Sequence, residues 1–478
     1  MLATIKRFGA AGSVFKNFSV LTISNALTQL LAMIISIKIA RSLNPEQFGT
    51  YNLLLVHVNI FVVVASVGIR RTIVRDIARD KSIVQQVLSY SIILRIVGIL
   101  LSVIAFGIYF YFFHQYEVFL FLLVVLSIIS AVFFDHFDSL AFGLEKMEYS
   151  GFISFISTSL WLLTILFLPK ENLTLKTVFL IYFVFSTLKT ILYIFVKKKR
   201  LKYKTDFSLA NKEGVVHFGK ESFPFYYLDL FSLLSIQIPI LFLEYRSGTE
   251  QIGFFNIANK ILIPINLVVG TALSAIFPNL ARLYTNNFER FVSSVKSIFI
   301  IISLLGITGA FGITFFREEI ILLLYSEKYI SSSLVVGYQC WYVAVFSVVC
   351  LMGTILGAIN RQKELGYISF FCTFIQVPIL WYGAKGGAID LSAGFLVATV
   401  INMIIHFFAI HIYLDKSINI LFYLKITVLF ILAYVSSLFF PIEIDFLYRA
   451  LIFIALFFGG ATLVYLKYYK LVKNYISR

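Results

Sequence analysis

Charged side chains inside long apolar runs are the residues of this sequence best suited to chemistry. Arg95 and Lys260 each lie within such a run, away from its ends. A charge near the centre of a bilayer costs about 2.5–3.5 kcal/mol on insertion scales, so each needs a partner, water or an oppositely charged ligand. Three more arginines, Arg70, Arg71 and Arg75, follow the second apolar run. Together these cations predict a path for an anionic substrate.

Amide and hydroxyl side chains form polar stripes along several of the apolar runs. In the segment 254–281, for example, Asn256, Asn259 and Lys260 share one helical face, because successive side chains are about 100° apart. Such stripes either join helices or line a water-filled cavity, and their presence on several segments favours the cavity. The predicted substrate contacts are Lys260, Arg95, Asn256, Asn259, Asn25, Gln29 and Asn52.

Acidic side chains in the apolar runs are few and form no catalytic or metal-binding motif. Asp135, Asp138 and Asp229 are candidates for proton or sodium coupling, and all three lie near the ends of their segments. The histidines include no pair at metalloprotease spacing, and no phosphate-binding loop of the Gly-x-x-x-x-Gly-Lys-Ser/Thr type occurs. We therefore expect no metal, no cofactor and no ATP hydrolysis, and a secondary transporter rather than an enzyme.

The elements that must position these residues are membrane-spanning helices. The chain has 478 residues, of which 60% are hydrophobic and 13% charged, whereas soluble domains hold about 45–50% apolar and 25% charged residues. Since about 20 apolar residues span a bilayer, a soluble enzyme is excluded and an all-α polytopic membrane protein with about 14 transmembrane helices is expected. The predicted spans are 19–40, 50–69, 88–112, 117–142, 150–168, 174–196, 222–243, 254–281, 295–316, 334–359, 364–383, 389–413, 418–440 and 446–466.

Basic residues orient these spans. With a cytoplasmic N-terminus, 27 of the 40 Lys and Arg residues fall on the inner side and 8 on the outer side. Positively charged loops are retained in the cytoplasm, so both termini are predicted to be cytoplasmic and the protein to lie in the cell inner membrane. The net charge of +16 is explained by these loops and does not indicate nucleic-acid binding.

An internal repeat divides the chain. At an offset of 204 residues, Phe48-Gly49-Thr50-Tyr51-Asn52 aligns with Ile252-Gly253-Phe254-Phe255-Asn256. An even number of predicted spans lies between the starts of the two copies, so both copies have the same orientation in the membrane. Parallel repeats of this kind occur in transporters that work by alternating access. The predicted parts are an N-terminal six-helix lobe at 1–200, a cytoplasmic inter-lobe loop at 201–221, a C-terminal six-helix lobe at 222–415, and two extra helices with a cytoplasmic tail at 416–478.

Several segments resemble a known family. The repeat motif Phe48 to Asn52, the turn Val67-Gly68-Ile69 and the run RRTIVRDIAR from Arg70 to Arg79 are similar to the opening helices of polysaccharide repeat-unit flippases. The segments Ile313–Ser333 and Leu356–Ser369 are similar to an outer and an inner loop of the same proteins. These flippases belong to the multidrug/oligosaccharidyl-lipid/polysaccharide exporter superfamily.

The resemblance implies two six-helix lobes around a central cavity and a lipid-linked substrate. That substrate class is an undecaprenyl diphosphate-linked oligosaccharide, moved from the inner to the outer leaflet for O-antigen (lipopolysaccharide), capsule or exopolysaccharide assembly. Arginine suits a diphosphate because its planar guanidinium makes bidentate, charge-assisted bonds to phosphate oxygens. The implied partners are this lipid-linked sugar, membrane lipid and the glycan polymerase.

Three other functions stay open. A lipid II flippase and a cation-coupled multidrug exporter belong to the same superfamily. An exporter of organic cations should place acidic groups deep in its cavity, whereas the deepest charges here are Arg95 and Lys260. A membrane-bound glycan polymerase or ligase would need a sizeable outer loop, and the longest predicted one, at 317–333, is too short for that purpose.

The charge asymmetry makes the orientation testable. Cysteines introduced by Glu171→Cys and Glu327→Cys should react with an impermeant thiol reagent added to intact cells, because both positions are predicted to lie outside. Asp206→Cys and Tyr475→Cys should stay unlabelled until the membrane is opened. The reverse labelling pattern would contradict the predicted orientation.

Overall fold

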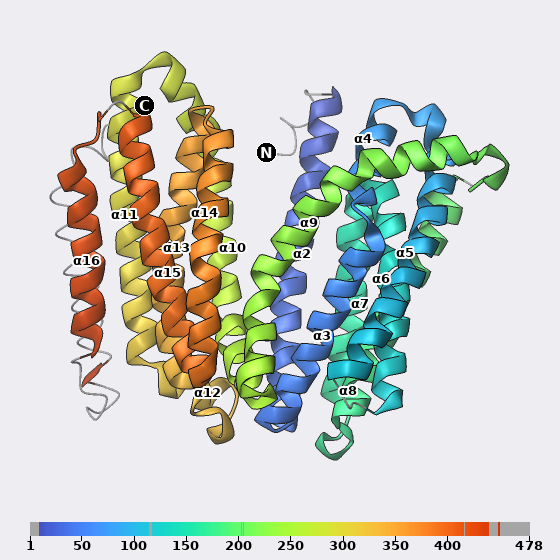
Figure 1. Cartoon of the computed structure of the whole chain (residues 1–478), viewed down its shortest axis with the longest axis horizontal. Helices are drawn as coiled ribbons and strands as arrows, with labels where there is room; N and C mark the ends of the chain where they lie inside the picture. Colours follow the sequence, from blue (N-terminus) through green and yellow to red (C-terminus); the bar gives the residue numbers. More distant parts are fainter. Residues whose placement is uncertain are drawn as a thin grey trace. The chain divides into compact units, whose positions relative to one another are not determined.

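The described part of the chain is a succession of long helices (Figure 1). The computed structural model describes residues 9–113, 117–201, 203, 205–414, 416–438 and 448–449, with side chains from residue 20 onward. Twelve segments are long and apolar enough to cross a membrane, and one of these contains two helices, α14 and α15. They match the first thirteen predicted spans, whereas the span at 446–466 lies almost wholly outside the described residues. The chain is an all-α, multi-pass membrane protein.

The first compact unit comprises residues 1–256. Its central helix is α3, which packs against α5, α6 and α9, while α2 packs against α7 and α6 against α8. The helices of this unit are α2 Gly9–Ser42, α3 Pro45–Ser66, α4 Ile69–Arg79, α5 Val84–Phe113, α6 Val118–Gly143, α7 Glu148–Phe167, α8 Leu175–Val196 and α9 Lys212–Ser247, with short helices at Lys81–Ile83, Lys170–Asn172, Lys197–Leu201 and Phe207–Leu209.

The second compact unit comprises residues 257–478. Its central helix is α13, which packs against α11 and α15, while α14 packs against α15 and α16 against α11. Helix α10, Thr249–Asn286, begins in the first unit and continues into the second. The other helices are α11 Phe288–Phe315, α12 Arg317–Leu324, α13 Ser332–Ala358, α14 Gln362–Gly383, α15 Gly387–Tyr413 and α16 Ile420–Leu438, with short helices at Glu327–Tyr329 and Ala384–Gly386.

Large apolar side chains remain exposed on many of these helices. Phe112, Phe167 and Leu323 are examples, and each is more than half exposed. Soluble monomers rarely expose extensive apolar surface, whereas lipid tails solvate it. The exposed side chains therefore support the membrane location that the apolar spans indicate.

The segment predicted as an inter-lobe loop, 201–221, is partly helical. Helix α9 begins at Lys212, because the Asn211 side chain accepts a hydrogen bond from the backbone N–H of Gly214 and so satisfies one of the unpaired donors of the first turn. The connection before α9 is therefore shorter than expected. The assignment of two six-helix lobes to 1–200 and 222–415 stays a prediction.

The two copies of the predicted repeat meet where α3 packs against the start of α10. A Cβ atom at Gly49 would lie 1.7 Å from the carbonyl oxygen of Thr249, and one at Gly253 would lie 2.3 Å from that of Pro45. Pro45 and Thr249 are themselves 204 residues apart, as are Gly49 and Gly253. Each copy therefore presents its glycine to the equivalent backbone of the other, and glycine allows two membrane helices to approach this closely.

The asparagines of the repeat behave in the same symmetric way. The Asn52 amide donates to the carbonyl oxygen of Phe48 at 2.7 Å, and the Asn256 amide donates to that of Ile252 at 3.0 Å. Both side chains are buried, and each bonds four residues back along its own helix. In this conformation their donors are therefore occupied by backbone, and their role as substrate contacts stays a prediction.

The close approach of α3 and α10 at Gly49 and Gly253, called the glycine crossing below, can be tested with matched alanine variants. Gly49→Ala should lower the free energy of unfolding by about 1–3 kcal/mol, because its methyl group would push α3 away from α10. Gly107→Ala is the control, since a Cβ atom there meets nothing within 4 Å and alanine favours helix by about 0.5–1 kcal/mol. Thermal unfolding of the purified proteins in detergent measures both. Equal stability of the two variants would contradict the crossing.

Candidate functional site

The arginine-rich helix α4 is placed by a sharp turn after α3. Val67 and Gly68 both adopt left-handed backbone conformations, with φ of 48° and 69°. A Cβ atom at Gly68 would lie 2.3 Å from the backbone nitrogen of Tyr226 in α9, so only glycine permits this turn beside that helix. The chain then forms α4, which buries Ile69, Thr72, Ile73 and Ile77. The remaining faces of α4 carry its arginines.

Asp135 of α6 joins two arginines from different helices. Its Oδ1 atom accepts from Arg70 of α4 at 2.7 Å, and its Oδ2 atom accepts from Arg95 of α5 at 2.6 Å. The other arm of the Arg70 guanidinium donates to Asp138 at 2.7 Å. Two carboxylates and two guanidiniums therefore form one continuous network across α4, α5 and α6.

Arg95 is the most deeply buried member of this network, with a side chain that is 0% exposed. Besides Asp135, it donates to the carbonyl oxygen of Val132 at 3.1 Å and to the hydroxyl of Ser91 at 3.4 Å. A buried charge is tolerated only when it is paired and its donors are satisfied. The surroundings of Arg95 meet both requirements, so the network holds this cation in place.

Arg70 stays positively charged at the edge of the network. Burial would lower the pKa of its guanidinium, but the carboxylates of Asp135 and Asp138 outweigh that effect and hold the pKa above its ordinary value. The guanidinium also lies over the ring of Phe142, 4.8 Å from its centroid, a contact that favours the cation.

A second and more exposed group of ion pairs links α4 to α9. Arg71 donates to Asp229 at 2.8 Å, and its side chain is 49% exposed. Arg75 donates to Asp76 at 2.7 Å and also pairs with Glu221. Exposed ion pairs contribute about 0–1 kcal/mol each. Arg71 is therefore held much less firmly than Arg95.

The structure thus gathers seven of the residues predicted from the sequence within the first unit. Asn25 and Gln29 are exposed on α2, and Asn259 and Lys260 lie on the part of α10 that belongs to the second unit. Among the described residues no group of three or more His, Cys, Asp or Glu side chains could hold a metal ion. The gathered residues are Arg70, Arg71, Arg75, Arg95, Asp135, Asp138 and Asp229.

Two members of these groups of polar contacts were not expected from the sequence. Tyr193 of α8 donates its hydroxyl hydrogen to Asp138, and Glu221 accepts from Arg75. A tyrosine in an apolar run carries no local signal of such a partner. Glu221 offered a weak one, because it is a carboxylate between Lys220 and the predicted span 222–243.

A third polar group lies between α3, α5 and α9. The hydroxyl of Tyr109 lies 3.4 Å from the imidazole Nε2 atom of His57 and donates to the carboxylate of Glu244 at 3.2 Å. His57 is 1% exposed. This group was also not expected, since nothing in the spacing of the three residues indicates that they meet.

Two solved structures of membrane proteins share the helical fold of this chain. The lipid II flippase MurJ has been solved in an inward closed conformation. Its structure aligns with 94% of this chain and 99% of the MurJ chain, at 16% identity and a TM-score of 0.68. The structure of an inward-facing multidrug resistance MATE family transporter of the MOP superfamily aligns with 82% of this chain and 96% of the transporter chain, at 14% identity and a TM-score of 0.62. These likenesses show a shared fold.

The chain belongs to the polysaccharide biosynthesis protein family, whose profile matches residues 14–284, more than half of its length. The capsular polysaccharide biosynthesis protein CapF of Staphylococcus aureus is 24% identical over 410 residues, which are 80% of this chain and 97% of that protein. The lipopolysaccharide biosynthesis protein WzxC of Escherichia coli K12 is 24% identical over 241 residues, 48% of this chain and only 47% of that protein.

The difference in burial between the two groups of ion pairs predicts different effects of equivalent substitutions. Asp135→Asn should lower the free energy of unfolding by ~3–5 kcal/mol, because it leaves the buried Arg95 without a counter-charge. Asp229→Asn should cost about 1 kcal/mol or less, because its partner Arg71 is half exposed. Thermal unfolding in detergent compares the stabilities of the two variants with that of the unaltered protein. A larger loss in Asp229→Asn would show that the buried network is not the more stabilising one.

Proposed function

We propose that this chain is a flippase and not an enzyme. Its substrate is an undecaprenyl diphosphate-linked oligosaccharide, which it moves from the inner to the outer leaflet of the cytoplasmic membrane by alternating access. Membership of the polysaccharide biosynthesis protein family supports a role in O-antigen, capsule or exopolysaccharide assembly. The fold shared with a lipid flippase supports movement of a lipid-linked substrate.

The observation that carries this proposal is the state of Lys260. It is partly exposed within the membrane-spanning helix α10, and it makes no ion pair or hydrogen bond with the described residues of its own unit. Unpaired cations at membrane depth are costly and mark substrate pathways. A diphosphate would supply the missing negative charge, so we assign Lys260 to contact the substrate headgroup.

Arg71 is suited to the first capture of the same headgroup. Its guanidinium is half exposed and is held by the single carboxylate of Asp229. Phosphate oxygens could displace that carboxylate at little cost, because an exposed ion pair contributes about 0–1 kcal/mol. Arg95, by contrast, is enclosed by protein groups, so we assign it to holding the network rather than to touching substrate.

The three carboxylates predicted as coupling residues are all paired with arginine. Asp135 and Asp138 share Arg70, and Asp229 holds Arg71. An exporter of organic cations needs a carboxylate that is free to bind its substrate, so this pairing favours the glycan flippase over the drug exporter. We further propose that Asp229 is the coupling residue, because release of Arg71 from its carboxylate frees the guanidinium for capture of the substrate.

Flipping can be measured with the purified chain in vesicles that contain a lipid-linked oligosaccharide, from the fraction that becomes accessible to a glycosidase added outside. Lys260→Ala should weaken substrate binding by ~1.5–3 kcal/mol, the value of one charged hydrogen bond. Lys260→Glu should abolish flipping through repulsion, and Lys260→Arg should preserve part of it. Lys425→Ala, which removes an exposed lysine of α16, is the matched control.

Two results would count against the proposal. Normal flipping by a correctly inserted Lys260→Glu protein would remove Lys260 from the substrate site. If the unaltered chain flips no lipid-linked oligosaccharide but does expel organic cations from the same vesicles, the drug-exporter alternative would replace the flippase.

A further inference from the structure

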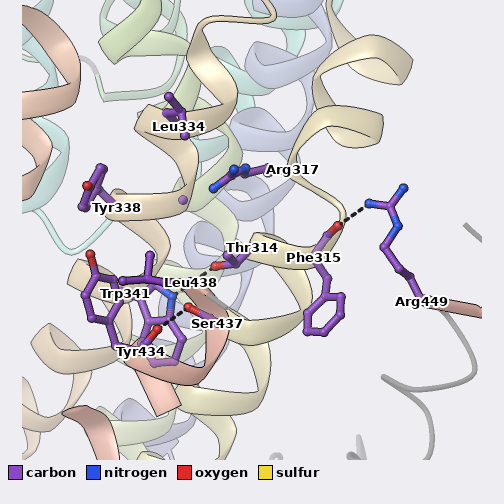
Figure 2. A pocket seen from close by; sticks show the side chains of 11 residues that line it. Thr314, Phe315, Arg317, Leu334, Tyr338, Trp341, Tyr434, Ser437, Leu438 and Arg449 are labelled. Carbon is purple, nitrogen blue, oxygen red and sulfur yellow. Dashed lines mark hydrogen bonds between the residues drawn. The ribbon is translucent and has the colours of Figure 1, made fainter. Parts of the chain in front are cut away.

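The second unit contains a cavity of its own. It lies where α11 passes into α12, with α13 and α16 forming its walls, and its volume is about 150 Å³ (Figure 2). A single water needs only about 10–15 Å³ measured in this way, so the cavity has room for a polyatomic group. Its lining includes Thr314, Arg317, Gly337, Tyr338, Trp341 and Tyr434.

Arg317 is the unsatisfied member of this lining. In the described part of the chain it makes no hydrogen bond or ion pair, and its Nε atom is buried without a partner. Its guanidinium extends over Gly337, where a Cβ atom would lie 3.3 Å from Nη1, and toward Tyr338 (Figure 2). A buried charged donor without an acceptor is unfavourable, so the cavity is suited to a ligand that supplies one.

The other arginine of the cavity is already neutralised. Arg449 donates to the carbonyl oxygen of Phe315 at 2.9 Å and forms an ion pair with Glu319. No acidic residue occurs among the described residues that line the cavity. The charge of Arg317 therefore remains uncompensated within it, and the bound group should be an anion.

The remaining walls are aromatic and largely satisfied. The indole N–H of Trp341 donates to the hydroxyl of Thr314 at 3.1 Å, so this pair needs no ligand. Tyr338 and Tyr434 add two further rings to the lining. Aromatic and arginine side chains at the end of an apolar helix are typical of the bilayer interface, and Arg317 directly follows α11 and Phe316.

We propose that this cavity binds a phosphate group, with Arg317 as its principal ligand. A guanidinium fork matches phosphate oxygens in a bidentate, charge-assisted geometry. The group can come from the headgroup of a membrane phospholipid or from free phosphate. The site is independent of the proposed flippase function, because it uses none of the residues assigned to the transported substrate.

The test uses the purified full chain in detergent with three probes: dioctanoyl phosphatidylglycerol, dioctanoylglycerol and inorganic phosphate. A ligand that binds the folded state raises Tm, and the rise grows with the logarithm of its concentration relative to Kd. The phosphatidylglycerol should raise Tm, and Arg317→Gln should weaken its binding about ten- to one-hundred-fold. Lys385→Gln, which removes an exposed lysine of the same unit, should bind like the unaltered protein.

Gly337→Ala provides a second variant that keeps every charge. Its methyl group would crowd the Arg317 guanidinium, so it should also weaken binding, even if Arg317→Gln fails to fold. An effect of phosphatidylglycerol without inorganic phosphate would identify a lipid headgroup, and an effect of both would identify phosphate in general. The proposal is overturned if no probe binds, if dioctanoylglycerol binds as well as phosphatidylglycerol, or if folded Arg317→Gln and Gly337→Ala bind it normally.

Discussion

The enclosed guanidinium of Arg95 constrains how α4, α5 and α6 of the first unit pack. A charge with no exposed surface must be matched by an opposite charge and by hydrogen-bond acceptors, and Asp135, Val132 and Ser91 provide them. Because Asp135 also binds Arg70, the requirement extends from α5 through α6 to α4. The amphipathic helix α4 is thereby held in one position, and the more exposed Arg71 is presented beside α9.

A second constraint is steric and acts at the repeat. Gly49 and Gly253 allow α3 and the start of α10 to approach until backbone meets backbone, and such contacts stabilise membrane helices because lipid provides no hydrophobic force between them. The two constraints serve different purposes. The glycine crossing sets the distance between helices, whereas the charge network determines which polar groups remain available. Arg71 and Lys260 are the cations on which the proposed function depends, and both are less firmly bound than Arg95.

Hydropathy predicted the helices well because the length of an apolar run is a local property of the chain. The first thirteen spans appear as helices with shifted ends, and the extra helix α4 is amphipathic rather than apolar, so a search for apolar spans does not detect it. The helical start of α9 at Lys212 was missed for the same reason, since it depends on the Asn211 cap within a polar segment. Seven charged residues of the site were also predicted individually, because charges in or beside apolar runs are conspicuous, whereas Asp76 and Glu221 were not.

The amino-acid sequence by itself determined the membrane-spanning character, the order of the first thirteen spans, the repeat at 204 residues and the identity of the charged residues. Only the tertiary structure decided which charges neutralise one another. Arg70 and Asp135 are 65 residues apart, and Tyr193 and Asp138 are 55 apart, so no helical periodicity relates them. Pairing over such separations is decided by how helices pack and by how much water reaches each side chain. For this reason Arg95, within an apolar span, is enclosed, whereas Arg71, just after one, is accessible.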